Sequence, residues 1–329
     1  MKIIKFILKW LLILVVGLFV LSILYEQYSR YSAKKNFVDN GTYVEIDGHK
    51  MHYLKKGEGT PTVVFESGLD FSGHMSWYKV QEEVSKFATT ISYDRAGILR
   101  SEKSDNPRTC ENMADELHML LEKIEAKKPY VLVVHSLGGL IARCYAKKYA
   151  DTLSGIVFVD ASHPEQLERA PESIKAKMKS AGLPSDWVIS LSYHTGLTRL
   201  SINSMLDVVL KDEKDKKILK AEINAYLIKS NNGAIEEAKM LEQMTKASKG
   251  VSFGDIPLTV LSANHKEAKG DERILFEFFY KLQKEHLILS TKSKQVFVES
   301  GHFIQLEKPE VVIDAIRDIV AENKISDKE

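Results

Sequence analysis

The stretch that decides the fold is VLVVHSLGGLIAR, residues 131–143. It begins as a run of apolar residues, typical of a buried strand, and continues into a helical pattern. Ser136 stands at the junction and is followed closely by Gly138 and Gly139. This order is typical of a nucleophile elbow, in which a sharp turn lifts the serine hydroxyl above the sheet and the next amide opens a helix. A serine that merely caps a helix is the structural alternative.

Other short β-rich runs surround this stretch, with helical patterns between them. The predicted strands are residues 62–65, 90–93, 130–134, 155–159, 258–261 and 295–298. Because these runs are continuous rather than alternating, they favour a parallel sheet that is covered on both faces. A hairpin is expected before them, around Asp47 and Gly48. We therefore predict an α/β fold with a mostly parallel, doubly wound sheet of about eight strands.

Residues 164–250 interrupt this rhythm of strands and helices. They are rich in Lys and Glu, follow helical patterns and contain no clear strand. We predict that they form a helical lid or cap, inserted above the carboxyl edge of the sheet. The core of the fold would then comprise residues 41–163 and 251–325.

The first thirty residues, 1–30, are predicted to be a separate membrane anchor. Residues 3–25 are almost wholly apolar, and at about 1.5 Å per residue a helix of this length spans a hydrocarbon layer of about 30 Å. A signal peptide is the rival interpretation, but the residues after the run are too bulky for a peptidase site. Lys2, Lys5 and Lys9 favour a cytoplasmic N-terminus, although basic residues also follow the span. We expect a single-pass membrane protein with its catalytic domain outside the cytoplasm.

The composition of the 329 residues is that of an ordinary globular protein, with 44% hydrophobic and 28% charged residues. A net charge of +1 gives no field that would attract nucleic acid. The two cysteines, Cys110 and Cys144, lack the spacing of a metal site. Nothing in the sequence supports a disulfide between them, and we expect Cys144 to be a buried, inert thiol. Neither a metal nor a cofactor is predicted.

Four landmarks between residue 42 and about residue 321 resemble the α/β-hydrolase superfamily, and they come in that family's order. They are ESGL at 66–69, YDRAG at 93–97, VHSLG at 134–138 and ESGHF at 299–303. The resemblance implies an oxyanion loop at the first landmark, a D-R-x-G turn at the second, the nucleophile Ser136 at the third and the catalytic histidine, His302, at the fourth. We expect Asp94 and Arg95 of the second landmark to form a structural pair beneath the loops.

The chain departs from the family's G-x-S-x-G pattern at Val134, where the first glycine is expected. That position is normally small because the tight elbow presses it against neighbouring backbone. The valine leaves three outcomes open: a tilted elbow, a slower enzyme, or a member that has lost activity.

The general base is predicted from the position of each histidine along the chain. A serine hydroxyl is a poor nucleophile until a histidine accepts its proton. Of the ten histidines, His302 alone lies in a loop beyond a core strand, at the edge where Ser136 emerges. His135 adjoins the nucleophile, but we expect its side chain to point away from that of Ser136.

The acid that orients the histidine has more than one candidate. Most members of the family that the chain resembles place this acid after the seventh strand, where this chain has Glu267 and Asp271. Some related lipases place it one strand earlier, and Asp160 directly follows residues 155–159. We predict Asp160, with Glu267 and Asp271 as the alternatives. For the oxyanion hole, the resemblance implies the backbone N–H groups of Leu69 and Leu137.

The expected function is hydrolysis of a carboxylic ester through an acyl-enzyme on Ser136. Serine at this position argues against haloalkane dehalogenase or epoxide hydrolase chemistry, which uses aspartate there in this family. The anchor and the apolar lid segments favour a hydrophobic or lipid-like small substrate. Carbon–carbon bond hydrolysis and acyl transfer by the same triad stay open, as does a ligand-binding or sensor protein without turnover. The expected partners are the small ester and the membrane, with no nucleic acid and no obligate protein partner.

Overall fold

The computed structural model describes residues 2–36, 41–181, 185–210, 212–264 and 269–326. Its centre is an eight-stranded sheet with the strand order β1-β2-β4-β3-β5-β6-β7-β8. The strands are β1 Thr42–Ile46, β2 His49–Lys56, β3 Thr62–Glu66, β4 Thr89–Tyr93, β5 Tyr130–His135, β6 Leu153–Val159, β7 Leu258–Ala263 and β8 Ser293–Val298. The first two strands run antiparallel to their neighbours, and β3 to β8 are parallel. The predicted strand number and mostly parallel order are confirmed.

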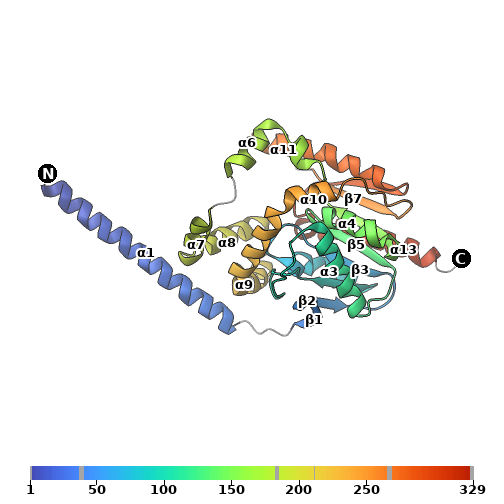
Figure 1. Cartoon of the computed structure of the whole chain (residues 1–329), viewed down its shortest axis with the longest axis horizontal. Helices are drawn as coiled ribbons and strands as arrows, with labels where there is room; N and C mark the ends of the chain where they lie inside the picture. Colours follow the sequence, from blue (N-terminus) through green and yellow to red (C-terminus); the bar gives the residue numbers. More distant parts are fainter. Residues whose placement is uncertain (1, 37–40, 182–184, 211, 265–268, 327–329) are drawn as a thin grey trace. The chain divides into compact units, whose positions relative to one another are not determined.

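Helices cover both faces of this sheet. Successive side chains of a strand point to opposite faces, so one strand can pack against helices on both sides. On one face, Leu132 and Val134 of β5 pack in a cluster with residues of α3 (Cys110–Lys123) and α4 (Gly138–Tyr149). On the other face, Val131 and Val133 pack in a cluster with residues of α2 (Tyr78–Val84) and α13 (Pro309–Ser326). The continuous apolar run of β5 thus contributes to one core on each face of the sheet. Figure 1 shows α3 and α4 beside β5.

In the described part of the chain, only helices lie between β6 and β7. They are α5 Gln166–Arg169, α6 Glu172–Ala181, α7 Asp186–His194, α8 Leu197–Val209, α9 Glu213–Lys239 and α10 Leu241–Ala247. The chain divides into two compact units, one of residues 1–40 and 181–228 and the other of residues 41–180 and 229–329. The insertion is therefore shared between the two units rather than forming one body.

A single long helix, α1 (Lys2–Asn36), precedes the sheet. It is long and apolar enough to cross a membrane, a property that it shares with signal sequences. The remaining elements are the short helices η1 Gly73–Trp77, η2 Ala150–Thr152 and η3 His286–Leu289, with α11 Gly270–Glu285 and α12 Ile304–Glu307.

The cysteines differ from the expectation of a buried, inert thiol. Cys110 and Cys144 form a disulfide, with their Cα atoms 5.9 Å apart. The bond joins α3 to α4, two helices that lie side by side on the same face of the sheet. The two residues are 34 positions apart in the chain, so their proximity depends on helix packing that no local sequence pattern encodes.

Candidate active site

Ser136 occupies a strained turn between β5 and α4. Its φ is +47°, in the left-handed region that residues other than glycine rarely adopt. The end of β6 holds the turn, because the Ser136 amide donates to the Val159 carbonyl at 3.3 Å and the Ser136 carbonyl accepts from the Ser162 amide at 2.7 Å. Strain of this kind persists where the surrounding structure enforces it, often at functional sites.

Two glycines allow the backbone to close around this serine. A Cβ on Gly139 would lie 2.7 Å from the Ala161 Cβ, at the start of the segment after β6. A Cβ on Gly68 would lie 3.1 Å from the Ser136 Cβ and 2.8 Å from the Nδ1 atom of His135. The segment after β3 therefore passes directly against the serine, as the predicted oxyanion loop requires.

Val134 lies in the core rather than against the turn. Its side chain is fully buried in the cluster beneath α3 and α4. In the sheet it pairs with Glu66 on one side and Phe158 on the other. Ser136 adopts its left-handed conformation with the valine in place, so this turn forms without a glycine at position 134.

His302 and Asp160 meet at the carboxyl edge of the sheet. His302 follows β8 and Asp160 directly follows β6, and the His302 Nδ1 atom lies 2.6 Å from the Asp160 Oδ2 atom. The other carboxylate oxygen of Asp160 accepts from the Ala263 amide at 3.1 Å, which fixes the carboxylate against the end of β7.

The charge of Asp160 also sets the protonation of the histidine. Burial lowers the pKa of His302, but the hydrogen bond and charge of Asp160 oppose it. With smaller contributions from Asp70 and Glu307, the net effect raises the pKa of His302 above its ordinary value. Opposite charge stabilises the imidazolium form, which is the form that a base passes through during proton transfer.

Ser136, Asp160 and His302 line one pocket of about 340 Å³. Ser162 and Gln166 also line it. Its apolar wall consists of Ala263 from β7 and three side chains of α11, which are Leu275, Phe276 and Phe279. The sequence interpretation overlooked this wall, although the run LFEFFY at 275–280 was an available signal.

The two alternative acids, Glu267 and Asp271, follow β7 in the sequence. Glu267 lies outside the described residues, and Asp271 lies in the first turn of α11 with its side chain outside what the structure describes. Asp160 is therefore the one candidate whose carboxylate has a described contact with His302.

Leu69 and Leu137 stand on either side of the serine turn. Leu137 caps the N-terminus of α4, and Leu69 follows Gly68 in the segment after β3. Within the described ranges, neither backbone N–H group donates a hydrogen bond. Two unengaged donors beside a nucleophile are what an oxyanion hole requires.

Arg95 holds the backbone of the same segment from below. Its guanidinium donates to the carbonyls of Ser67 at 2.8 Å and Gly68 at 2.6 Å. It also donates twice to the carboxylate of Glu237 on α9, each time at 2.8 Å, and once to Glu66. All three charged side chains are buried. The guanidinium therefore links the segment after β3 to the last turns of α9.

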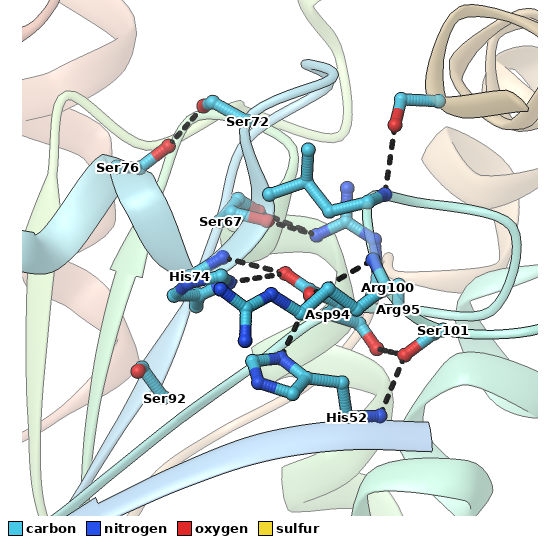
Figure 2. Close-up of polar contacts among 12 residues, drawn as sticks. His52, Ser67, Ser72, His74, Ser76, Ser92, Asp94, Arg95, Arg100 and Ser101 are labelled. Carbon is cyan, nitrogen blue, oxygen red and sulfur yellow. Dashed lines mark hydrogen bonds and ion pairs between the residues drawn. The ribbon is translucent and has the colours of Figure 1, made fainter. Parts of the chain in front are cut away.

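Asp94, the neighbour of Arg95, has different partners. The predicted pairing is wrong, because among the described residues no ion pair joins Asp94 to Arg95. The Asp94 carboxylate lies 2.9 Å from His52 Nδ1 and 2.8 Å from His74 Nδ1 (Figure 2). The charges of the two histidines outweigh burial and hold the pKa of Asp94 well below its usual range.

His52, His74 and Asp94 bring three groups of metal-ligating type within 4.8 Å of one another. Two ligand atoms on one tetrahedral zinc are about 3.3 Å apart, given bonds of about 2.0 Å. The nitrogen–oxygen separations of 2.8 and 2.9 Å are shorter and match hydrogen bonds. We interpret the group as a buried network that anchors the turn after β4.

His135 contributes to the site in a way that the sequence did not indicate. Its Nε2 atom lies 3.1 Å from the backbone carbonyl of His302, to which it donates, and its ring lies 4.6 Å from the His302 ring. Burial lowers the pKa of His135 well below its ordinary value, with a further contribution from His302. A neutral His135 thus supports the loop that carries the predicted base.

The comparisons with known proteins agree with this architecture. The family described as "alpha/beta hydrolase fold" matches residues 61–199. Over these residues the chain is similar to that family. The chain is 27% identical to the uncharacterized protein YbdG of Bacillus subtilis, over 80% of each chain.

Solved structures share its fold at low sequence identity. The epoxide hydrolase CorEH is 19% identical with a TM-score of 0.65, over 86% of this chain and 99% of that one. A thermophilic esterase from Thermogutta terrifontis is 18% identical with a TM-score of 0.56, over 86% of this chain and 97% of that one. Because these two proteins have different activities, the shared fold does not determine the reaction of this chain.

Proposed function

We propose that the protein is a serine hydrolase that cleaves a carboxylic ester through an acyl-enzyme on Ser136. One observation carries the proposal. A serine held at positive φ shares a pocket with a histidine, and the Nδ1 atom of that histidine is engaged by a carboxylate at 2.6 Å. A nucleophile, a base and a group that orients the base are the three parts that acyl transfer to serine requires.

The mechanism follows from the role of each atom. Asp160 holds Nδ1–H of His302, which leaves Nε2 free to accept the proton of the Ser136 hydroxyl during attack on the ester carbonyl. The N–H groups of Leu69 and Leu137 stabilise the oxyanion. His302 then protonates the leaving alcohol. In the second half-reaction it activates a water molecule, which releases the acid and restores the serine.

The residue type at the elbow favours ester over epoxide or halide substrates. In this superfamily those two chemistries use an aspartate at the nucleophile position, and here Ser136 occupies it. A serine cannot form the carboxylate ester intermediate that an aspartate forms. The similarity in fold to the epoxide hydrolase CorEH therefore does not carry its activity to this chain.

The lining of the pocket and the N-terminal helix suggest a hydrophobic substrate. The wall of Leu275, Phe276 and Phe279 offers apolar contact to an acyl chain. We further propose that α1 anchors the protein in a membrane, with the sheet on the extracytoplasmic side. The Cys110–Cys144 disulfide supports that side, because disulfides persist in oxidising compartments.

A hydrolysis assay on the full-length protein in detergent tests the proposal. We expect turnover of p-nitrophenyl esters, no opening of a matched aryl epoxide, and a loss on the order of 10⁶-fold in Ser136→Ala. Ser162→Ala is the matched control, because this serine lines the same pocket but has no role in the mechanism. Ester turnover that survives in Ser136→Ala would overturn the proposal. Epoxide opening by the wild type would overturn the substrate class.

A further inference from the structure

The α7–α8 hairpin has an apolar outer surface. Its exposed apolar side chains are Trp187, Val188, Leu191, Leu197, Leu200, Met205 and Val208. Trp187 is 70% exposed and Val208 is 81% exposed. The two helices contain no lysine, and their one arginine, Arg199, is buried. A cluster of large apolar side chains with so few charges is the signature of a surface that contacts something other than water.

Packing within the hairpin does not require this outer surface. The inner face of α8 buries Ile202 and Leu206. The first part of α9 lies beside α8, where Lys220 forms an ion pair with Asp207 at 2.6 Å. The helix therefore already has a buried side, and its outer side chains are left for another contact.

Side chains of α1 that follow its apolar residues form hydrogen bonds and ion pairs with this hairpin. Glu26, which directly follows the apolar residues 3–25, is 1% exposed. Its carboxylate accepts from Arg199 of α8 at 2.8 and 3.0 Å and from Arg30 at 2.9 Å. Arg30 also donates to the carbonyl of Tyr193 in α7. The ion cluster of Glu26, Arg30 and Arg199 therefore joins both hairpin helices to α1 at the point where the apolar span ends.

Aromatic side chains lie in the same part of α1 as Glu26 and Arg30. Tyr25, Tyr28 and Tyr31 recur every three residues and are all exposed. Tyrosine and tryptophan concentrate at membrane–water interfaces, where the ring contacts acyl chains and the polar group stays hydrated. On the neighbouring hairpin, Trp187 fits the same environment.

From these observations we infer that the α7–α8 hairpin lies in the interface of the membrane that α1 crosses. Its seven exposed apolar side chains contact lipid at the boundary between headgroups and acyl chains, and the Glu26–Arg199 pair sets their depth. This inference rests on the membrane anchoring proposed above and is independent of the reaction. It adds a second membrane-contacting element, drawn from the insertion between β6 and β7, to the N-terminal span.

Tryptophan quenching by brominated lipids tests the inference on the full-length protein in phosphatidylcholine vesicles. The chain has three tryptophans, and Trp77 is fully buried in the core. Trp10→Phe therefore reports Trp187, Trp187→Phe reports Trp10, and the double variant gives the constant signal of Trp77. We expect lipids brominated near the headgroup to quench most of the Trp187 emission, more strongly than lipids brominated near the chain end.

The possible results distinguish lipid contact by the hairpin from membrane insertion of α1. Quenching of Trp10 without quenching of Trp187 would overturn the inference and keep the anchor, and would favour a hairpin that faces the rest of the protein. Absence of quenching at both tryptophans would overturn both. Quenching of Trp187 alone would contradict the arrangement in which α1 carries the hairpin.

The ion cluster has its own test in the same vesicles. We expect Arg199→Gln, made in the Trp10→Phe background, to reduce the quenching of Trp187. The same substitution in the Trp187→Phe background should leave the quenching of Trp10 unchanged. Arg169→Gln, which removes an ion-paired but exposed arginine of the same insertion, is the matched control. Equal quenching of Trp187 in Arg199→Gln and the parent would show that the cluster does not set its depth.

Discussion

At the scale of single residues, the contact between His302 and Asp160 governs the pH dependence of the proposed reaction. The base must be neutral to accept a proton, and the pKa of His302 is raised above its ordinary value of 6.5. The rate should therefore rise with pH through a midpoint above 6.5. In Asp160→Asn the burial remains and the opposing charge is gone, so the pKa falls and the midpoint moves to lower pH. We also expect a loss of about 10⁴-fold in kcat, because asparagine no longer selects the productive tautomer.

Profiles of kcat/KM across the range in which imidazole titrates check this prediction. Asp314→Asn, an exposed aspartate on α13, should leave the midpoint and the rate unchanged. An Asp160→Asn enzyme with the wild-type midpoint and rate would remove Asp160 from the mechanism and return Glu267 and Asp271 as candidates.

Val134 provides a second prediction at this scale. Because its side chain is fully buried in the core, Val134→Gly should lower the free energy of unfolding by about 3 kcal/mol through the lost packing and the added chain entropy. Val133→Gly is the matched control, since it removes an equally buried valine from the opposite face of β5. We expect similar losses in thermal denaturation and no gain in kcat. A gain of about tenfold in Val134→Gly alone would show that the valine impairs the elbow.

At the scale of elements, Glu237 connects α9 through Arg95 to the segment after β3, which we propose as the oxyanion loop. The guanidinium bonds the carboxylate of Glu237 and the carbonyls of Ser67 and Gly68. Glu237→Gln removes two charge-assisted hydrogen bonds from the buried guanidinium but leaves Glu66 as its carboxylate partner. It should therefore cost about 1.5–3 kcal/mol in stability, and it should lower kcat more than it changes KM because the segment carries a proposed oxyanion donor.

Glu236→Gln is the control for this substitution. Glu236 is the preceding residue of α9, and it forms an exposed ion pair with Lys239. Its loss should change the stability by no more than about 0.5 kcal/mol. Denaturant unfolding and initial rates, measured on both variants, check this prediction. Equal stability and equal kcat in Glu237→Gln and Glu236→Gln would contradict it.

The elements also show what could be predicted from the sequence. The strands could be predicted because continuous apolar runs are local signals, and the approach of His302 to Asp160 could be predicted because both follow strands that end at one edge. The wall formed by α11, the disulfide and the Arg95–Glu237 contact could not. Each depends on which faces of distant helices meet, and Glu237 lies 142 residues from Arg95. The contacts of Asp94 could not be predicted for the same reason, because its partners His52 and His74 come from β2 and η1.

At the scale of the whole molecule, the disulfide connects stability with location. Cys110 and Cys144 close a loop of 34 residues, and the chain-entropy account gives such a bond about 3–4 kcal/mol. Reductant should lower the melting temperature of the wild type but not that of a Cys110→Ala/Cys144→Ala variant. If the sheet lies outside the cytoplasm, alkylation of intact cells should find both thiols blocked. Free thiols in cells would contradict that placement.

The central claim is that Ser136 is an activated nucleophile, and covalent labelling tests it most directly. Full-length protein treated with a fluorophosphonate should gain one adduct by intact mass, and peptide mapping should locate that adduct on Ser136. His302→Ala should label far more slowly, and Ser136→Ala should not label. A folded wild type that gains no adduct, or one whose adduct lies on another residue, would contradict the account.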